Sequence, residues 1–541
     1  MTKNLYRSLV LLATFSFYGT AQNNNLESIK TTVQANVDIS ELRAQLDEIS
    51  QQTYMPCHAI GYSADLKVKD AFKHGTSYYW KIQANDLAIK AFLDVEPLPL
   101  GDTVFIKNIA GEKVQYLTRD NLLQNKWSSK VVPEEIVIQY KSHNSEIPQI
   151  RIRSYSLQEL PKGSLQTDDF GDSQFCEVNM NCSEGNNYQD VKNSVVRILV
   201  KVDNAYFWCT GSLINNTTFD HAPYILTAEH CALNGSKFSS AADLKDWEFY
   251  FQYESPNCSN PPNEGNLASK VITGASMLAR SNDQGGTTGS DFLLLELDLS
   301  FNNGLFPPSI QPYFAGWNRL DIAPASGVAI HHPEGDIKKI STSTQPALSG
   351  EYTASASNTH WIVYWNATAN GHGVTEGGSS GGAFFNGNRE ITGTLTGGFA
   401  SCSFKNDEDF YGKFSYHWDQ NGNTPNRRLK DWLDPLNTNV TSLSGTTLSD
   451  SAPPYDSDLI SIAPNPVQNG KMYINGLYEV GSEIIEIYNL QGEKVYPKFD
   501  DRPAKDIMEN GYLAVDHLAN GPYVLRIISN QGTDTYKFVI Q

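Results

Sequence analysis

A serine enclosed by glycines is the strongest chemical signal in this sequence. The run Thr375 to Ala383 reads TEGGSSGGA, and Ser380 is the residue we take as a candidate nucleophile. Glycines let a backbone turn tightly, so the amide N–H groups of Gly378 and Ser380 could stabilise an oxyanion during acyl transfer. Because Gly/Ser-rich loops are often plain turns, this interpretation needs support from the surrounding elements.

Two further residues complete a possible catalytic set, and each lies at the end of an apolar run. His230 follows the strand-like run Tyr224 to Ala228, and Asp291 precedes the apolar run Phe292 to Leu297. A histidine could take the serine proton, and a carboxylate could hold the histidine ring in one tautomer. The order His, Asp, Ser is that of chymotrypsin and differs from the orders in subtilisins and α/β-hydrolases.

With these residues in place, the sequence resembles the chymotrypsin-like serine proteases and, more narrowly, the secreted bacterial lysyl endopeptidases. The resemblance runs from Phe170 to Leu443 and is carried by Cys209–Asn216, Leu226–Cys231, Ile330–Pro333 and Leu429–Asp434. It implies a mainly β protein with a double β-barrel and an active site between the barrels. Short alternating runs separated by Gly/Asn/Ser loops, at Ser194–Val202, Trp247–Tyr253 and Trp361–Trp365, independently favour this architecture.

The resemblance also implies residues that bind substrate. Asp409, two residues before Tyr411-Gly412-Lys413, would form the floor of the specificity pocket and bind the substrate lysine. A desolvated carboxylate forms a charge-assisted hydrogen bond with an ammonium group. The run Thr396-Gly397-Gly398 and Tyr352 would also contact substrate.

The sequence departs from the family pattern at three positions, two of which are among these substrate-binding residues. Thr396 stands where well-studied members carry a histidine, and Tyr352 where they carry a tryptophan. Ser379 replaces the aspartate that captures a new N-terminus in trypsin-type zymogens, so activation by that salt bridge is not expected.

Seven cysteines point to an oxidising compartment. Six lie within the protease segment, and sequence alone allows many pairings among them. The family resemblance implies the pairs Cys176–Cys402, Cys182–Cys258 and Cys209–Cys231. Cys57 is left without a partner.

The N-terminal third has two segments of different character. Residues 1–21 have basic residues, an apolar run from Leu9 to Tyr18 and small residues before Gln22, which predicts a signal peptide. Residues 22–162 show one run of helical spacing (Ile39, Leu42, Leu46, Ile49) followed by strand-like runs, and resemble the β-rich propeptides of lysyl endopeptidase precursors, which assist folding and block the cleft. An unrelated binding module is the alternative. Lys162 is the predicted processing point, because a lysine-specific enzyme could cleave there.

The C-terminal part is set off by a composition change. We expect a protease domain over 163–445, a Ser/Asp/Pro-rich linker over 446–457 and a small β-sandwich over 458–541. The alternating runs Ile484–Val495, Gly521–Ile527 and Tyr536–Ile540 resemble the sorting domains of type IX secretion substrates. That resemblance implies the secretion machinery as a partner and a secreted or cell-surface location. A carbohydrate-binding or adhesive sandwich is the alternative.

Several other classes of function are not favoured. With 60 acidic and 41 basic residues, the net charge of −19 argues against a nucleic-acid partner. The apolar run at residues 9–18 is too short to span a membrane. We expect neither cofactor nor metal: His331 and His332 are adjacent on a predicted strand and would point to opposite faces.

The sequence therefore predicts a secreted, monomeric serine endopeptidase that cleaves proteins or peptides after lysine through an acyl-enzyme. Two alternatives stay open. One is a trypsin-like protease that accepts arginine and lysine, and the other is an inactive adhesin built on a protease fold.

Overall fold

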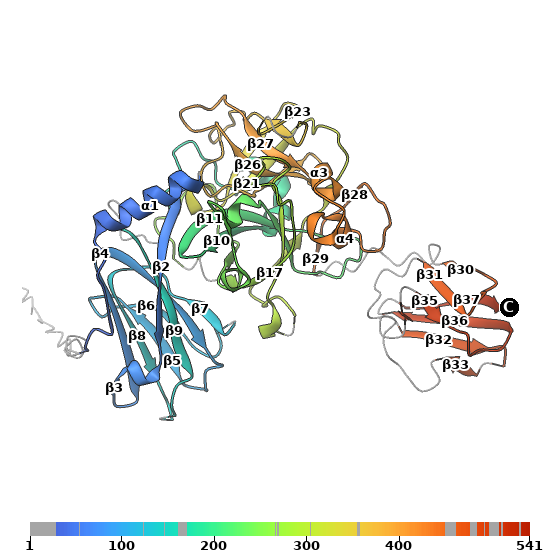
Figure 1. Cartoon of the computed structure of the whole chain (residues 1–541), viewed down its shortest axis with the longest axis horizontal. Helices are drawn as coiled ribbons and strands as arrows, with labels where there is room; N and C mark the ends of the chain where they lie inside the picture. Colours follow the sequence, from blue (N-terminus) through green and yellow to red (C-terminus); the bar gives the residue numbers. More distant parts are fainter. Residues whose placement is uncertain are drawn as a thin grey trace, which may run out of the picture.

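The computed structural model of this chain is mainly β and has three parts (Figure 1). It describes residues 29–160, 170–448 and 461–541, with gaps at 54, 123, 145, 266, 268–269, 303, 354–356, 476–483, 492, 497–507, 510–511 and 530–531. The predicted signal peptide, the predicted processing point Lys162 and most of the predicted linker lie outside the described residues.

The N-terminal part packs one helix against a large, mostly antiparallel sheet. Helix α1 (Ile39–Thr53) buries Leu42 and Leu46, as the helical spacing of its apolar residues predicts. The sheet has the order β2-β9-β4-β8-β5-β6, with β1, β3 and β7 paired along the long strand β4. Its strands are β1 (Val33–Ala35), β2 (Cys57–Leu66), β3 (Phe72–His74), β4 (Ser77–Val95), β5 (Thr103–Lys107), β6 (Lys113–Leu117), β7 (Lys126–Ser128), β8 (Val132–Lys141) and β9 (Ile150–Glu159).

The first half of the central part is a sheet that curls back on itself. Its order is β16-β15-β10-β11-β12-β18-β17, and the two end strands follow each other in the chain through Gly274 alone. We call this sheet the first ring, because its two end strands are adjacent in the chain. Its members are β10 (Val195–Val202), β11 (Ala205–Leu213), β12 (Tyr224–Thr227), β15 (Glu248–Phe251), β16 (Val271–Thr273), β17 (Ala275–Arg280) and β18 (Leu293–Leu297).

The second half repeats the same pairing scheme. Its order is β22-β21-β25-β26-β27-β24-β23, and here too the end strands are consecutive in the chain. The central part is thus mainly β, as the sequence predicts, and consists of two consecutive sheets of similar pairing. The members are β21 (Gly327–His331), β22 (Lys339–Ser343), β23 (Leu348–Gly350), β24 (His360–Val363), β25 (Ala383–Asn386), β26 (Ile391–Gly398) and β27 (Asp409–Lys413).

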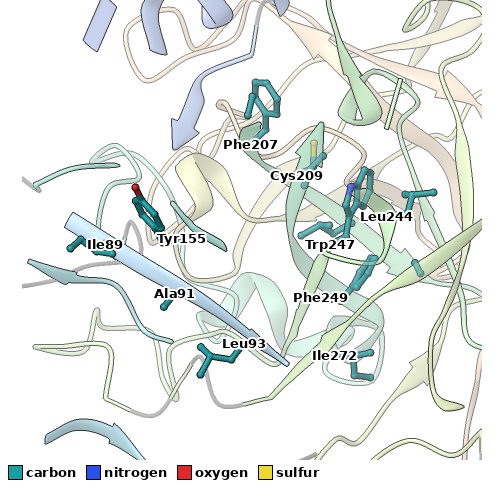
Figure 2. Packing of buried hydrophobic residues seen from close by; sticks show 14 of the residues in the cluster. Ile89, Ala91, Leu93, Tyr155, Phe207, Cys209, Leu244, Trp247, Phe249 and Ile272 are labelled. Atoms are coloured by element: carbon teal, nitrogen blue, oxygen red, sulfur yellow. The ribbon is translucent and has the colours of Figure 1, made fainter. Parts of the chain in front are cut away.

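The N-terminal and central parts share one sheet and one core. Strand β2 pairs antiparallel with β11, with Ala59 opposite Tyr206. Figure 2 shows the shared core from close by: Ile89 and Leu93 of β4 belong to the same apolar cluster as Trp247 and the strands of the first ring. Burying apolar surface continuously across the two parts favours their association.

The C-terminal part has its own core between two sheets. The described strands form the orders β30-β31-β35-β34 and β33-β32-β36-β37. Met472, Ile487, Leu525 and Phe538 are among the buried residues between them. The bounds are β30 (Ser461–Ala463), β31 (Lys471–Asn475), β32 (Ile484–Asn489), β33 (Lys494–Tyr496), β34 (Met508–Glu509), β35 (Tyr512–Ala514), β36 (Gly521–Ser529) and β37 (Gly532–Ile540). In the portion of the chain that the structure describes, no helix has the length and apolar character that crossing a membrane requires.

Candidate active site

His230 and Asp291 lie side by side because their strands are paired. Strand β12 ends at Thr227, three residues before His230, and Leu293 of β18 pairs with Thr227. The His230 Nδ1 atom is 2.6 Å from Asp291 Oδ2, and the His230 backbone N–H donates to Asp291 Oδ1 at 2.9 Å. Asp291 is fully buried, whereas the His230 side chain keeps 15% of its surface exposed. Asp291 thus fixes the ring and leaves Nε2 directed away from it.

Gly381 brings the serine loop against the same strand end. Its φ is +79°, and a Cβ atom there would lie 2.6 Å from Thr210 O and would also collide with Thr227 Oγ1. Ser380 O accepts the Thr210 N–H at 2.8 Å and lies 3.7 Å from the sulfur of Cys231, the residue after His230. The loop therefore packs against the turn that carries His230.

Between the described side chains of His230 and Ser380, no hydrogen bond is formed. Such bonds are often long in unliganded sites and tighten when substrate binds.

Two backbone amides beside Ser380 are available as donors. Gly377 O accepts the Glu334 N–H, and because C=O and N–H are antiparallel in a trans peptide, the Gly378 N–H points the opposite way. Within the described residues, neither the Gly378 nor the Ser380 N–H donates to another group. Gly378 has φ +85°, and a Cβ there would lie 2.7 Å from His332 O, so this turn requires glycine.

Ser379 is turned into the protein interior. Its hydroxyl lies 2.7 Å from His331 Nδ1 and accepts the Glu376 N–H at 3.1 Å. Burial lowers the pKa of His331 to about 3, so the ring is neutral at physiological pH. The serine loop is thus anchored by a neutral hydrogen bond where trypsin-type zymogens use an aspartate. Ser380 is the partly exposed member of the pair.

Asp409 is buried beneath the end of β26. It opens strand β27 and pairs with Gly398, where a side chain would collide with the Asp409 carboxylate. Asp409 Oδ2 accepts hydrogen bonds from Trp365 Nε1 at 2.6 Å and Thr375 Oγ1 at 2.7 Å, and Oδ1 accepts the Ala400 N–H at 3.3 Å.

No cationic partner for Asp409 is present among the described residues. Burial raises its pKa to about 7, against the opposing effect of these hydrogen bonds. A buried carboxylate without a counter-ion is suited to receive a cationic ligand group.

The other predicted substrate-binding residues lie on or beside β26. Tyr352 lies over Gly397, where an added Cβ would be 3.1 Å from the tyrosine hydroxyl oxygen. Thr396 is buried, and its Oγ1 is 3.0 Å from His360 Nε2. Tyr352 also contacts the His360 ring, at 5.8 Å between centroids. Thr396 and Tyr352 are therefore linked through His360, which the sequence did not mark as part of the site.

Comparisons with known proteins show similarity for two parts of this chain. Residues 170–412 match the family model for the C-terminal domain of lysyl endopeptidase. This part of the chain is therefore similar to that domain. Residues 461–541 match the model for the secretion system C-terminal sorting domain, which indicates an exported protein that is secreted or held at the cell surface.

One curated relative is the lysyl endopeptidase of Pseudomonas aeruginosa, which is 30% identical over 286 residues. The alignment covers 50% of this chain and 55% of the relative, so the chain spans about half of that relative's length.

Similar solved structures are serine proteases. The thermostable protease AL20 from an extremophilic microorganism has a TM-score of 0.28 and 16% identity, over 41% of this chain and 92% of that one. A Glu endopeptidase has a TM-score of 0.27 and 16% identity, over 46% and 94% respectively.

The lysyl endopeptidase-like segment contains three disulfides in the pairs that the sequence resemblance implies: Cys176–Cys402, Cys182–Cys258 and Cys209–Cys231. The last one ties the residue after His230 to strand β11. Cys57 is a buried free thiol in β2.

Each of the two adjacent histidines makes hydrogen-bond contacts within this segment. His331 bonds Ser379 and Ser341, whereas His332 Nδ1 contacts Asp336 O at 2.9 Å. In the described portion of the chain, no cluster of three or more His, Cys, Asp or Glu residues could hold a metal ion.

Proposed function

We propose that this protein is a serine endopeptidase whose triad is Ser380, His230 and Asp291. The short contact between His230 and Asp291, at the point where the serine loop packs on β12, carries the proposal. An imidazole held by a buried carboxylate is the general base that a serine needs. The two available amides of Gly378 and Ser380 lie on the same loop and support an oxyanion-hole role.

The mechanism follows from these positions. His230 Nε2 takes the Ser380 hydroxyl proton while Ser380 Oγ attacks the peptide carbonyl carbon. The oxyanion is stabilised by the Gly378 and Ser380 amides, and His230 then protonates the leaving amine, which gives an acyl-enzyme. Water deprotonated by His230 attacks the ester and releases the acid. Asp291 stabilises the positive charge on His230 in both steps.

Lysine is the proposed residue on the acyl side of the scissile bond. The Asp409 carboxylate is buried, lacks a counter-ion in the described chain and lies directly under Gly398. The relative named lysyl endopeptidase supports the same substrate class. Asp409 supplies one carboxylate to the bound side chain. The ammonium group of lysine is compact and lies on a flexible chain, so it suits a single carboxylate better than the broad guanidinium of arginine does.

Residues 22–162 are proposed to be a propeptide that covers one side of the cleft. Pro56 lies against the serine loop, because a Cβ at Gly377 would be 2.7 Å from its Cγ. Lys90 forms a buried ion pair with Glu248 of the first ring at 3.1 Å. A substrate extending past the oxyanion loop would meet this segment, so its removal after Lys162 is the proposed activation step.

The remaining boundaries are proposals as well. We assign 163–445 to the protease, 446–457 to a linker and 458–541 to a sorting domain that engages the secretion machinery. All triad residues come from one chain, which is consistent with an active monomer.

Labelling with a fluorophosphonate tests this function. The secreted protein should be labelled, and Ser380→Ala should not be. Absence of labelling in a folded, propeptide-free protein would favour the inactive-adhesin alternative.

A further inference from the structure

Two buried carboxyl groups lie directly behind the proposed triad and have no role in the chemistry above. Glu229 immediately precedes His230, and Asp283 lies in the loop between β17 and β18. Their exposed fractions are only 1% and 4%. The Glu229 carboxyl group accepts the Asp283 backbone N–H, which places the two acidic residues next to each other. Because two buried carboxylates repel strongly, we expect one of them to hold a proton.

Asp283 is attached to the backbone of Asp291. Its Oδ2 atom accepts the Asp291 N–H at 2.8 Å, and its Oδ1 atom accepts the Gly286 N–H at 3.0 Å. Asp291 has φ +59°, in the left-handed region that costs energy for a residue with a side chain. The bond from Asp283 at the backbone and the His230 contacts at the carboxylate hold Asp291 in this conformation from both ends.

Glu229 is attached to the same loop at two further points. Its Oε2 atom accepts the Asp283 N–H at 2.8 Å and the Ser281 hydroxyl at 3.1 Å. The Ser281 oxygen in turn accepts the Phe292 N–H at 3.1 Å. Hydrogen bonds therefore run from the residue before His230 to the N–H groups of both Asp291 and the residue after it.

We propose that Glu229 and Asp283 are a positioning pair that shares one proton and holds Asp291 in the orientation in which it orders His230. The inference rests on the proposed function, since it assigns these residues to the same triad. Neither residue touches the reacting atoms, so both act through Asp291. The pair differs from the triad in needing a proton to work.

The proton is retained near neutral pH. Burial, and then the hydrogen bond and charge of Asp283, raise the pKa of Glu229 to about 8. Burial would also raise the pKa of Asp283, but the bond from Glu229 and the N–H groups of Gly286 and Asp291 outweigh it and lower that pKa. Glu229 is therefore the protonated member, and as the pH rises through about 8 the proton is lost and the two carboxylates repel.

Other charged and titratable groups face the pair from neighbouring elements. The Arg280 guanidinium of β17 is 3.4 Å from Glu229 Oε1 and favours its ionised form, whereas the Asp291 charge favours the neutral form. His360 of β24 and His417 are buried, and burial lowers their pKa values to about 4 and 3. Both rings are neutral across the alkaline range, so they add no titration of their own there.

The test compares pH profiles of kcat and KM for Glu229→Gln, Asp283→Asn and a control, Glu390→Gln. All are measured in the secreted protein with a lysyl peptide p-nitroanilide, from pH 6 to 10. Glu390 lies at the β25–β26 turn, where it accepts side-chain hydrogen bonds from Asn318 and Asn386.

Glu229→Gln keeps a donor toward Asp283 at every pH, so kcat should stay within about threefold of wild type at pH 7. Wild type should lose kcat above pH 8, and Glu229→Gln should not show this loss. Asp283→Asn replaces one acceptor by a donor facing N–H groups, so kcat should fall about 10- to 100-fold, with KM nearly unchanged. The control should match wild type throughout.

The proposal would be overturned if kcat of Glu229→Gln fell above pH 8 in the same way as kcat of wild type. It would also be overturned if Asp283→Asn had a normal kcat and only a lower melting temperature. If Asp283→Asn does not fold, the Glu229→Gln profile decides alone. Failure of the proposed function gives a different result: wild type itself would be inactive and unlabelled by fluorophosphonate.

Discussion

Replacing Asp409 by asparagine tests whether the buried carboxylate selects lysine. In Asp409→Asn, the amide oxygen can still accept one hydrogen bond from Trp365 or Thr375, but the negative charge is lost. A lysyl ammonium would then be buried without a counter-ion. We therefore expect a large defect for lysyl substrates and little change for a neutral substrate of similar length.

The size of the defect follows from the burial of Asp409, which is fully inaccessible to solvent. Removing one partner of a buried, hydrogen-bonded charge pair costs about 2–5 kcal/mol. At about 1.36 kcal/mol per factor of ten, kcat/KM for a lysyl ester should fall by about 30- to 5,000-fold. A norleucyl ester should change by less than about threefold, because it brings no charge to the pocket.

The same residue predicts a pH dependence. Since burial raises the pKa of Asp409 to about 7, the acid is neutral below that pH and charged above it. The ratio of kcat/KM for lysyl over norleucyl esters should rise as the pH increases through 7 and level off above it. Taking the ratio cancels any effect of pH on catalysis that is common to both substrates.

The assay needs lysyl, arginyl and norleucyl esters and one control variant, Asp407→Asn, which removes a partly exposed carboxylate two residues away. The control should behave as wild type. A ratio that stays flat with pH, or an Asp409→Asn enzyme with unchanged lysyl activity, would refute the assignment and redirect it to Asp407 or Glu408. Equal cleavage of lysyl and arginyl esters would favour the trypsin-like alternative.

Three other perturbations address the rest of the molecule. Asp291→Asn should lower kcat about 10⁴-fold through loss of the correct histidine tautomer, measured by active-site-titrated kinetics. In the Ser380→Ala precursor, Lys90→Met should destabilise the folded chain by about 3–5 kcal/mol, because it leaves Glu248 buried and unpaired; denaturant unfolding measures this, and Arg43→Met, which breaks an exposed pair, should have little effect. Because burial raises the pKa of the Cys57 thiol to about 12, iodoacetamide at pH 8 should leave Cys57 unmodified in the folded precursor and modify it after unfolding, as read by mass spectrometry.

The sequence predicted those parts of the site that follow local rules. His230 and Asp291 each adjoin an apolar strand, so their placement at strand ends could be inferred from patterning alone. Ser380 was marked by its glycines, and two of these, Gly378 and Gly381, do adopt positive φ. Helix α1 follows from the spacing of its apolar residues.

The parts that sequence analysis missed depend on contacts between distant residues. Glu229 and Asp283 are ordinary acidic residues in the sequence, and only the fold of the β17–β18 loop brings them together. Nothing local indicates that His331 would bond Ser379. The position of Glu229 directly before His230 was the one visible signal, because an acid there must either reach solvent or find a partner.

The junction between the N-terminal and central parts was also beyond sequence reasoning. The sequence of β2 does not specify which strand it pairs with, and its partner β11 begins at Ala205, far along the chain. In the sequence, Lys90 is a charged residue within an apolar run. Its ion-pair partner, Glu248, can be identified only from the fold. Strand pairing and buried ion pairs of this kind are selected by the whole structure.

The identity of the nucleophile is the central claim, and mass spectrometry of the fluorophosphonate-labelled protein tests it most directly. The account predicts a single adduct on the peptide that contains Ser380, and loss of both labelling and peptide hydrolysis, by about 10⁶-fold in turnover, in a folded Ser380→Ala variant. An adduct on another serine, such as Ser379, or a Ser380→Ala protein that keeps its hydrolytic activity would contradict it.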